Sequence, residues 1–157
     1  RWERDLWGLF LSIQKPLIAQ LHGYVIGSGI EIAALCDIRI AADNSIFRMP
    51  EVALGMIPAA GGTQTLRNLV GLDRAMEMIM TNRVVKAREA IKIRLVDRVV
   101  SGEILNSSAE VIAEGLTKIE PELLASIKSS VMRGLDLGLE RGLQHEKRNS
   151  YHIAKNN

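Results

Sequence analysis

The sequence lacks several features that would assign it to a specialised class of protein. It contains a single cysteine, Cys36, so no disulfide can form within the chain, and a reducing compartment fits. Its charges are nearly balanced, and a net charge of +2 does not by itself indicate a nucleic-acid partner. No apolar run reaches the length of a membrane span. The opening residues, RWERDLWGLF, have no features of a secretory signal.

The chain also has no internal repeat, linker or low-complexity stretch. Its three histidines, His22, His145 and His152, do not have the spacing of metal ligands, so we expect no metal site. What is present is ordinary for a globular protein, because 47% of the residues are hydrophobic and 24% are charged. At 157 residues the chain is long enough to bury a substantial core.

Hydrophobic periodicity predicts strands that alternate with helices, and therefore an α/β fold. The predicted strands are 16–26, 38–42, 46–50 and 95–100. The predicted helices are 1–14, 29–36, 65–82 with a break near Gly71, 86–94, 103–119 and 121–150. Residues 51–66 are predicted to form a loop rich in Gly and Pro, in which Thr63 could cap the helix that follows. Trp2, Leu6, Leu9, Phe10 and Ile13 have the spacing of an amphipathic helix.

Three glycines recur every four residues in the last predicted helix, at Gly134, Gly138 and Gly142. Glycine destabilises a helix interior by roughly 1 kcal/mol relative to alanine. One interpretation is a helix that bends or breaks near Gly138. The other is a surface that packs closely on a second helix, in this chain or in a partner subunit.

The stretch HGYVIGSGIEIAALCD places Gly27-Ser28-Gly29 just before an apolar helix that contains Glu31. Free backbone N–H groups at such a turn can stabilise an anion or a developing oxyanion, although a simple strand-to-helix turn would have the same sequence. Glu31 could complement the helix dipole. Its neighbours are nearly all apolar, however, which favours a partly buried carboxylate with a partner or a chemical role.

A second carboxylate, Glu51, follows Pro50 in similarly apolar surroundings, within FRMPEVALGMIPAAGGTQ. Two carboxylates in apolar environments are suited to general acid–base catalysis. Cys36 and His22 could instead form a thiol–imidazole pair, but a packing role for Cys36 within the apolar helix is favoured.

The stretch from KPLIAQLHGYVIGSGIEIAALCD through IRIAADNSIFRMPEVALGMIPAAGGTQTLRNLVG strongly resembles the enoyl-CoA hydratase/isomerase (crotonase) family, and the resemblance continues through AMEMIMTNRVVKAREAIKIRLVDRVV. It implies a spiral of ββα turns over residues 1–100, partial because the N-terminal turns are missing. Residues 101–157 would form a C-terminal helical region that assembles a homotrimer or a dimer of trimers. Asn82 and Arg94 stand where the family usually has glycine.

The resemblance also implies the chemistry. Acyl-CoA thioesters would be the substrates, and the N–H of Ser28 would bind the thioester oxygen as it becomes enolate-like. Family members that hydrate enoyl thioesters carry glutamates at positions matching Glu31 and Glu51. Glu31 would deprotonate the attacking water, and Glu51 would deliver a proton to the α-carbon. The remaining substrate contacts would come from Gly27, Gly55, Ile57 and Pro58.

The family's first oxyanion N–H comes from an upstream Ala-Gly-Ala-Asp-like motif that has no counterpart in this sequence. The resemblance therefore predicts a fragment of an enoyl-CoA hydratase, a lyase of fatty-acid metabolism, that would be a poor catalyst alone. No cofactor is implied, because coenzyme A arrives with the substrate, and no membrane association is implied. The implied location is the cytoplasm, or the mitochondrial matrix in a eukaryote.

Two other functions remain open. One is a different crotonase reaction, either double-bond isomerisation or hydration of a cyclic dienoyl-CoA. The other is a non-catalytic role such as RNA binding, for which the basic residues Lys86, Arg88, Lys92 and Arg94 are candidates. Glu89 interrupts these charges and no aromatic residue lies among them, which favours a solvated helix face over an RNA site.

Overall fold

The computed structural model describes residues 6–156, with side-chain surroundings for residues 8–155. Six short strands are present in this range: β1 Ile18–Leu21, β2 Tyr24–Ile26, β3 Ile38–Ala42, β4 Ile46–Arg48, β5 Val85–Lys86 and β6 Arg98–Val100. The α-helices are α1 Leu6–Ser12, α2 Ser28–Ala34, α3 Gly62–Val70, α4 Leu72–Thr81, α5 Ala87–Lys92, α6 Leu105–Thr117, α7 Pro121–Leu137 and α8 Leu139–Asn156. Two 3₁₀ turns, η1 Glu51–Leu54 and η2 Gly102–Ile104, complete the set.

The strands form two sheets, and successive segments of chain contribute one strand to each before a helix follows. The first sheet has the order β1-β3-β6 and is parallel throughout. The second has the order β2-β4-β5, in which β2 and β4 are parallel and β5 is antiparallel. The succession β1, β2, α2 and then β3, β4, α3 is the ββα spiral that the resemblance implied. The predicted α/β class is therefore confirmed.

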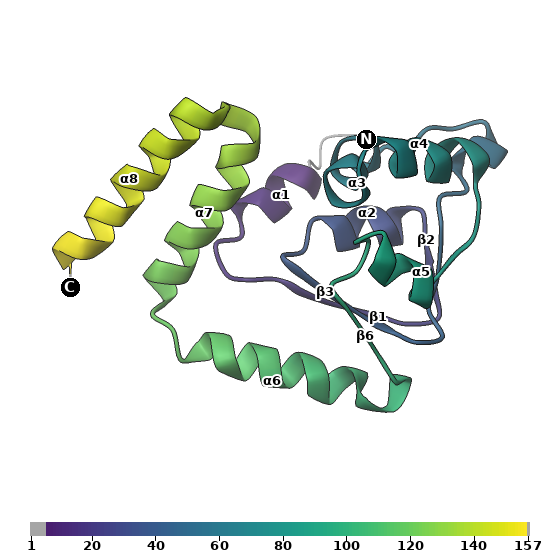
Figure 1. The fold of residues 1–157 in the computed structure, drawn as a ribbon, viewed down its shortest axis with the longest axis horizontal. Helices are drawn as coiled ribbons and strands as arrows, with labels where there is room; N and C mark the ends of the chain where they lie inside the picture. The colour runs from purple at the N-terminus through teal and green to yellow at the C-terminus, as the bar shows by residue number, and fades with distance from the viewer. Residues whose placement is uncertain (1–5, 157) are drawn as a thin grey trace.

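The core lies where the two sheets meet α2, α3 and α4 (Figure 1). In the central strand β3, Ile40, Ala41 and Ala42 are fully buried, as expected for a parallel strand covered on both faces. Phe47 of β4 and Leu66 of α3 are among the largest side chains packed into this core. A second cluster joins β3 to Leu105 and Ala109, so α6 also covers the first sheet.

The prediction of one strand over residues 16–26 is wrong. The chain forms β1, turns at Gly23 with φ of +60°, and then forms β2 in the other sheet. Glycine adopts this left-handed conformation without steric cost, so an apolar run that seems continuous in sequence is divided between two sheets. The strands β3 and β4 lie within their predicted ranges, whereas β5 was not predicted.

The predicted loop over residues 51–66 is partly ordered. It begins with the turn η1, and α3 starts at Gly62, which places Thr63 inside the helix. Thr63 is therefore not the cap: Gly61 holds that position, with φ of +99° and no side-chain hydrogen bond. Cys36 also lies outside its predicted helix, because α2 ends at Ala34.

The two helix breaks that the sequence predicted, near Gly71 and Gly138, are present. Gly71 separates α3 from α4 and Gly138 separates α7 from α8, both with positive φ. Asn82 and Arg94 are the described non-glycine residues with positive φ, at +54° and +65°. These are the two positions where the family resemblance expected glycine.

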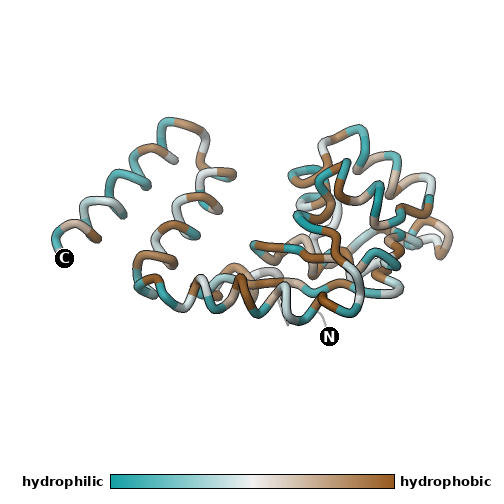
Figure 2. Tube along the Cα trace, turned by 60° about the horizontal axis from the view of Figure 1, so that its bottom comes forward, coloured by the Kyte–Doolittle hydropathy of each residue, from teal (hydrophilic) through white to brown (hydrophobic). Residues whose placement is uncertain are grey.

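The helices α7 and α8 form an antiparallel hairpin that extends away from the core (Figure 1). A Cβ added to Gly142 would lie 3.5 Å from the Cα of Gly134, an ordinary van der Waals distance, so the two helices of one chain approach each other here without requiring glycine. Figure 2 shows mostly hydrophilic residues along α8, and none of residues 121–155 in the two helices is buried. Trp2 lies outside the described residues. Between residues 6 and 156, no helix is both long enough and apolar enough to cross a membrane.

Candidate active site

The turn before α2 is a tight glycine turn that leaves backbone N–H groups without acceptors among the described residues. Gly27 adopts φ of +51°, donates its N–H to the carbonyl of Arg48, and accepts from the N–H groups of Ile30 and Glu31. The backbone N–H groups of Ser28 and Gly29 belong to the first two residues of α2 and have no acceptor within residues 6–156. Ser28 itself is exposed. A backbone donor is therefore available at the position where the sequence predicted one.

Glu31 is almost completely buried, with 2% of its surface exposed. Its Oε1 atom accepts hydrogen bonds from the backbone N–H of Ala60, at 2.9 Å, and of Gly62, at 2.8 Å. These donors belong to the start of α3, where backbone N–H groups and the helix dipole both favour a carboxylate. The second oxygen, Oε2, accepts no hydrogen bond from the described residues. The buried carboxylate is therefore held through one oxygen only.

Glu51 begins the turn η1 and reaches back to the same place. A Cβ added to Gly27 would lie only 2.6 Å from Oε1 of Glu51, so this side chain rests directly on the glycine. The Oε2 atom of Glu51 is buried and has no hydrogen-bond partner among the described residues. A buried carboxylate oxygen without a protein partner is uncommon and is often explained by a chemical role.

Two segments predicted for the site are thus in contact: the carboxylate of Glu51 lies against Gly27, in the turn that begins the helix of Ser28 and Glu31. The Glu31 carboxylate is bound at the start of α3. This convergence of segments separated along the chain could not be derived from spacing.

The other predicted residues lie around this turn in different states of burial. Pro58 is buried and would be 3.0 Å from a Cβ added to Gly62. Gly55 and Ile57 are exposed, and the Ile57 side chain retains 77% of its accessible surface. The sequence analysis missed Ala60 and Gly62, although the AAGG sequence was a visible signal for a backbone that approaches another group closely.

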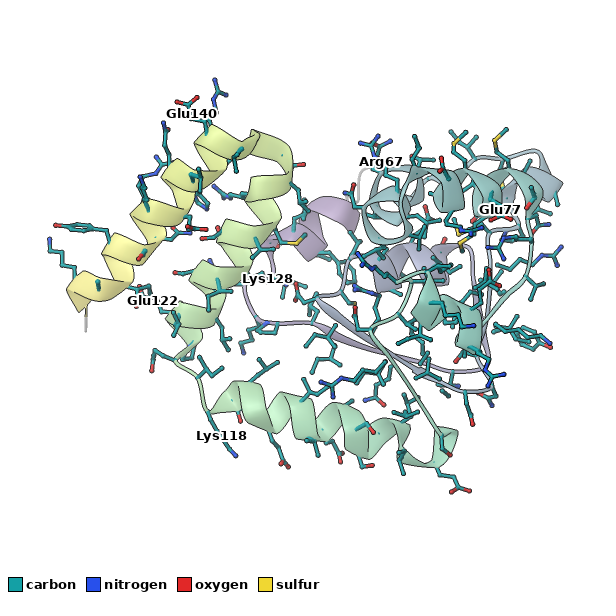
Figure 3. All side chains as sticks on the ribbon, in the orientation of Figure 1. Arg67, Glu77, Lys118, Glu122, Lys128 and Glu140 are labelled. Carbon is teal, nitrogen blue, oxygen red and sulfur yellow. The ribbon has the colours of Figure 1, made fainter. Side chains whose placement is uncertain are left out.

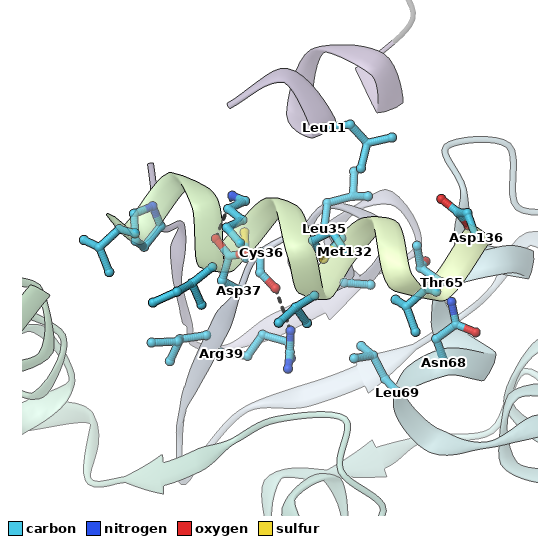
Figure 4. Close-up of a pocket in the computed structure, with 18 of the residues that line it drawn as sticks. Leu11, Leu35, Cys36, Asp37, Arg39, Thr65, Asn68, Leu69, Met132 and Asp136 are labelled. Carbon is cyan, nitrogen blue, oxygen red and sulfur yellow. Dashed lines mark hydrogen bonds and ion pairs between the residues drawn. The ribbon is translucent and has the colours of Figure 1, made fainter. Parts of the chain in front are cut away.

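A separate groove of about 460 Å³ lies between the core and α7, and neither Glu31 nor Glu51 lines it (Figure 4). Its walls are mainly apolar, and their residues include Leu35 and Leu69 from the core and Met132 from α7. Across it, Lys128 of α7 donates to Oδ2 of Asp37 at 2.7 Å. This groove is therefore separate from the two glutamates.

The surroundings of Cys36 and of Glu77 shift the pKa of each. Burial raises the pKa of the Cys36 thiol and the Asp37 carboxylate adds to the effect, which makes Cys36 a weak nucleophile. A hydrogen bond from Arg74, together with the charge of Arg83, lowers the pKa of the exposed Glu77. Across the described part of the chain, no three His, Cys, Asp or Glu residues form a group that could hold a metal ion.

Comparison with known proteins identifies the family. A family model described as enoyl-CoA hydratase/isomerase matches residues 2–157. A probable enoyl-CoA hydratase of Mycobacterium leprae is 37% identical over 142 residues, which cover 90% of this chain and 55% of that protein. A short-chain-enoyl-CoA hydratase of Clostridium acetobutylicum is 40% identical over 134 residues, covering 85% of this chain and 51% of that protein. The chain belongs to the enoyl-CoA hydratase/isomerase family.

Solved structures agree with this assignment. An enoyl-CoA hydratase subunit from Geobacillus kaustophilus superposes with a TM-score of 0.91 at 37% identity, covering 95% of this chain and 58% of that one. A Thermobifida fusca enoyl-CoA hydratase homologue, solved with acetoacetyl-CoA, gives a TM-score of 0.85 at 31% identity, with 89% and 55% of the two chains covered. The chain thus spans about half the length of the relatives that it matches.

Proposed function

We propose that the protein containing this chain is an enoyl-CoA hydratase, a hydro-lyase that adds water across the 2,3 double bond of an enoyl-CoA thioester. The observation that carries this proposal is a pair of carboxylates on adjoining segments: Glu51 lies against Gly27, and Glu31 belongs to the helix that the Gly27–Ser28 turn begins. One carboxylate is fixed through a single oxygen, and the other keeps a buried oxygen without a protein partner. The relatives named above, which are called enoyl-CoA hydratases, support the same reaction.

In this mechanism the thioester oxygen lies at the N–H of Ser28. As water attacks the β-carbon, the conjugated thioester becomes an enolate, and negative charge develops on that oxygen. A fixed backbone donor stabilises this charge without reorganising, and loss of one such donor typically reduces the rate by about 10²–10³. The second donor would come from the upstream segment that the family resemblance implies.

The two glutamates would divide the proton transfers. Glu31 removes a proton from the attacking water, whose oxygen forms a bond to the β-carbon. Glu51 holds the same water and delivers its proton to the α-carbon. The proton taken up by Glu31 then returns to Glu51, so that both glutamates are restored and one water molecule is added in total. General acid–base catalysis of this kind contributes about 10²–10⁴ in rate.

The substrate would be an acyl-CoA thioester, and we infer no further cofactor. A structural relative bound to acetoacetyl-CoA and another bound to CoA support this substrate class. Gly55, Ile57 and Pro58 would border the acyl group beside the turn. Some relatives are named mitochondrial and others are bacterial. Both are in keeping with a location of this protein in the mitochondrial matrix or the cytoplasm.

We further propose a homotrimer, or a dimer of trimers, assembled through residues 101–157. Ile127, Val131 and Leu135 support this, because they recur every four residues on α7 and all remain exposed in the single chain. Sedimentation of the full-length protein should give a mass of three or six chains. A monomer at micromolar concentration would contradict this assembly.

The proposed reaction is tested with crotonyl-CoA and the protein at its full natural length. Ultraviolet absorbance of the conjugated thioester should fall as 3-hydroxyacyl-CoA forms, with one solvent oxygen incorporated. We expect Glu31→Gln and Glu51→Gln each to lower kcat by about 10²–10⁴. The exposed Glu140→Gln serves as the matched control and should retain full activity.

Two results would contradict the proposal. A double variant of Glu31 and Glu51 with unimpaired turnover would remove both carboxylates from the mechanism. A product without solvent oxygen would indicate double-bond isomerisation instead of hydration.

A further inference from the structure

Gly62 differs from the other glycines that the structure describes between Gly23 and Gly142. Its φ lies outside the left-handed region, so the backbone at this position does not require glycine. A Cβ at Gly62 would nevertheless lie 2.8 Å from Oε1 of Glu31 and 3.0 Å from Cβ of Pro58. Among those glycines with ordinary φ, no other would bring a Cβ within 3.0 Å of a neighbour. What requires glycine at Gly62 is space beside a carboxylate.

The same residue donates the shorter of the two hydrogen bonds to that carboxylate. The N–H of Gly62 lies 2.8 Å from Oε1 of Glu31, and the N–H of Ala60 lies 2.9 Å from the same atom. Two donors on one oxygen fix both the position and the rotation of the carboxylate plane. The Oε2 atom, which accepts nothing from the described residues, is then the oxygen available to a water molecule.

We propose that Gly62 is a positioning residue for Glu31: the absence of its side chain lets the carboxylate bind the start of α3 through Oε1 and present Oε2 to the attacking water. This inference rests on the proposed hydration, since it assigns the proton-accepting atom within that mechanism. Gly62 contacts no substrate and acts only through Glu31. The added methyl group of Gly62→Ala would displace the carboxylate from its two donors.

The first test measures hydration of crotonyl-CoA by the full-length Gly62→Ala variant. A displacement of about 1 Å in a catalytic group can reduce turnover about 10²-fold, so we expect kcat to fall by this factor. KM should change less than kcat, because the added methyl group comes closer to Glu31, at 2.8 Å, than to the substrate-bordering Pro58, at 3.0 Å. Gly115→Ala on α6 is the matched control, since that glycine also has ordinary φ and open space around its Cβ position. It should keep full activity.

The second test asks whether Gly62 acts through Glu31. In the Glu31→Gln background, Gly62→Ala should cause no further loss of kcat, because the carboxylate that it positions is already absent. Full activity of Gly62→Ala would overturn the inference. Losses that simply multiply in the double variant would also overturn it, because they would show two independent effects.

A readout without catalysis separates this inference from the proposed reaction. Glu31→Ala removes the carboxylate that the new methyl group would meet at 2.8 Å and leaves only the Pro58 contact at 3.0 Å. We therefore expect Gly62→Ala to lower the denaturant midpoint of the natural protein more than that of Glu31→Ala. If Glu31→Gln remains fully active, the proposed hydration mechanism is wrong, and the difference between the two midpoint shifts still tests whether Gly62 positions Glu31. Equal shifts of the denaturant midpoint in both backgrounds would show that it does not.

Discussion

The core formed by the two sheets and helices α2–α6 differs sharply from the hairpin of α7 and α8. The core has side chains with no exposed surface in β3, α3 and α4, whereas no residue from 121 to 155 in the hairpin is buried. Figure 3 shows the contrast in the labelled charges: Glu140 points away from the core, and Glu122 pairs with His152 of α8 at 2.9 Å. Lys128 alone of the labelled hairpin residues is tied to the core, through Asp37. The core can therefore fix a catalytic geometry by packing, while the single chain leaves the hairpin surface available to an assembly.

The largest difference between the two regions should appear when leucines of the same size are truncated. Leu66 of α3 is fully buried, and Leu139 of α8 is 80% exposed. We expect Leu66→Ala to lower the free energy of unfolding by about 2–5 kcal/mol, through lost burial and a residual cavity. Leu139→Ala should change it by less than about 0.5 kcal/mol. Denaturant unfolding of the two full-length variants makes the comparison, and equal losses would contradict it.

Removing the ion pair between Lys128 of the hairpin and Asp37 of the core should have a smaller, local effect. Lys128 donates to Oδ2 of Asp37 at 2.7 Å and to the carbonyl of Lys15 at 3.0 Å. Lys128→Met keeps the apolar stem and removes the charged donor, which contributes about 1.5–3 kcal/mol to such a partly buried pair. Amide hydrogen exchange should accelerate in α7 and stay unchanged in β3. The exposed Lys118→Met on α6 is the control, and protection retained throughout α7 would show that the tie is not needed.

A substitution in the turn between α7 and α8 should reduce stability by still less. Gly138 has φ of +72° and ψ of +161°, a conformation almost confined to glycine. Gly138→Ala should therefore destabilise the hairpin by about 1–2 kcal/mol. Helical circular dichroism on heating should show this loss. Gly134→Ala, at a position with ordinary φ and no atom within 4 Å of the added Cβ, should cause none.

The smallest effect concerns how ionisation of the Cys36 thiol changes stability and reactivity with pH. Cys36 lines the groove between the core and α7. Burial and the Asp37 carboxylate raise its pKa in the folded chain. The thiol form therefore contributes stability that is complete below the unfolded pKa and is lost as pH rises through the folded pKa. Alkylation should be slower in the folded than in the denatured protein between these two values. Equal rates across that window would contradict the raised pKa.

Much of the site was visible in the sequence. The GSG turn, the acidic residues Glu31 and Glu51, and the break at Gly138 were all predicted from residue type and local order, and family membership follows from the ordered motifs. Local sequence carries this information because turns, helix starts and apolar surroundings depend on near neighbours.

Contacts between distant segments had to come from the tertiary structure. No spacing rule could show that residues 16–26 divide between two sheets at Gly23, or that Thr63 lies inside α3 instead of capping it. The two residues that donate hydrogen bonds to Glu31 follow it in the chain by 29 and 31 positions. A local sequence pattern could therefore not predict these contacts either.

By itself, then, the sequence determined the α/β class, the family and the identity of the two acids, because each depends on residues read in order. Only the tertiary structure decided that Glu51 lies against Gly27, that one oxygen of Glu31 is bound to the start of α3, and that a Cβ at Gly62 would lie 2.8 Å from that oxygen. The physical reason is that close packing and hydrogen-bond geometry are set by long-range approach of backbone segments, where a single methyl group is enough to exclude a carboxylate.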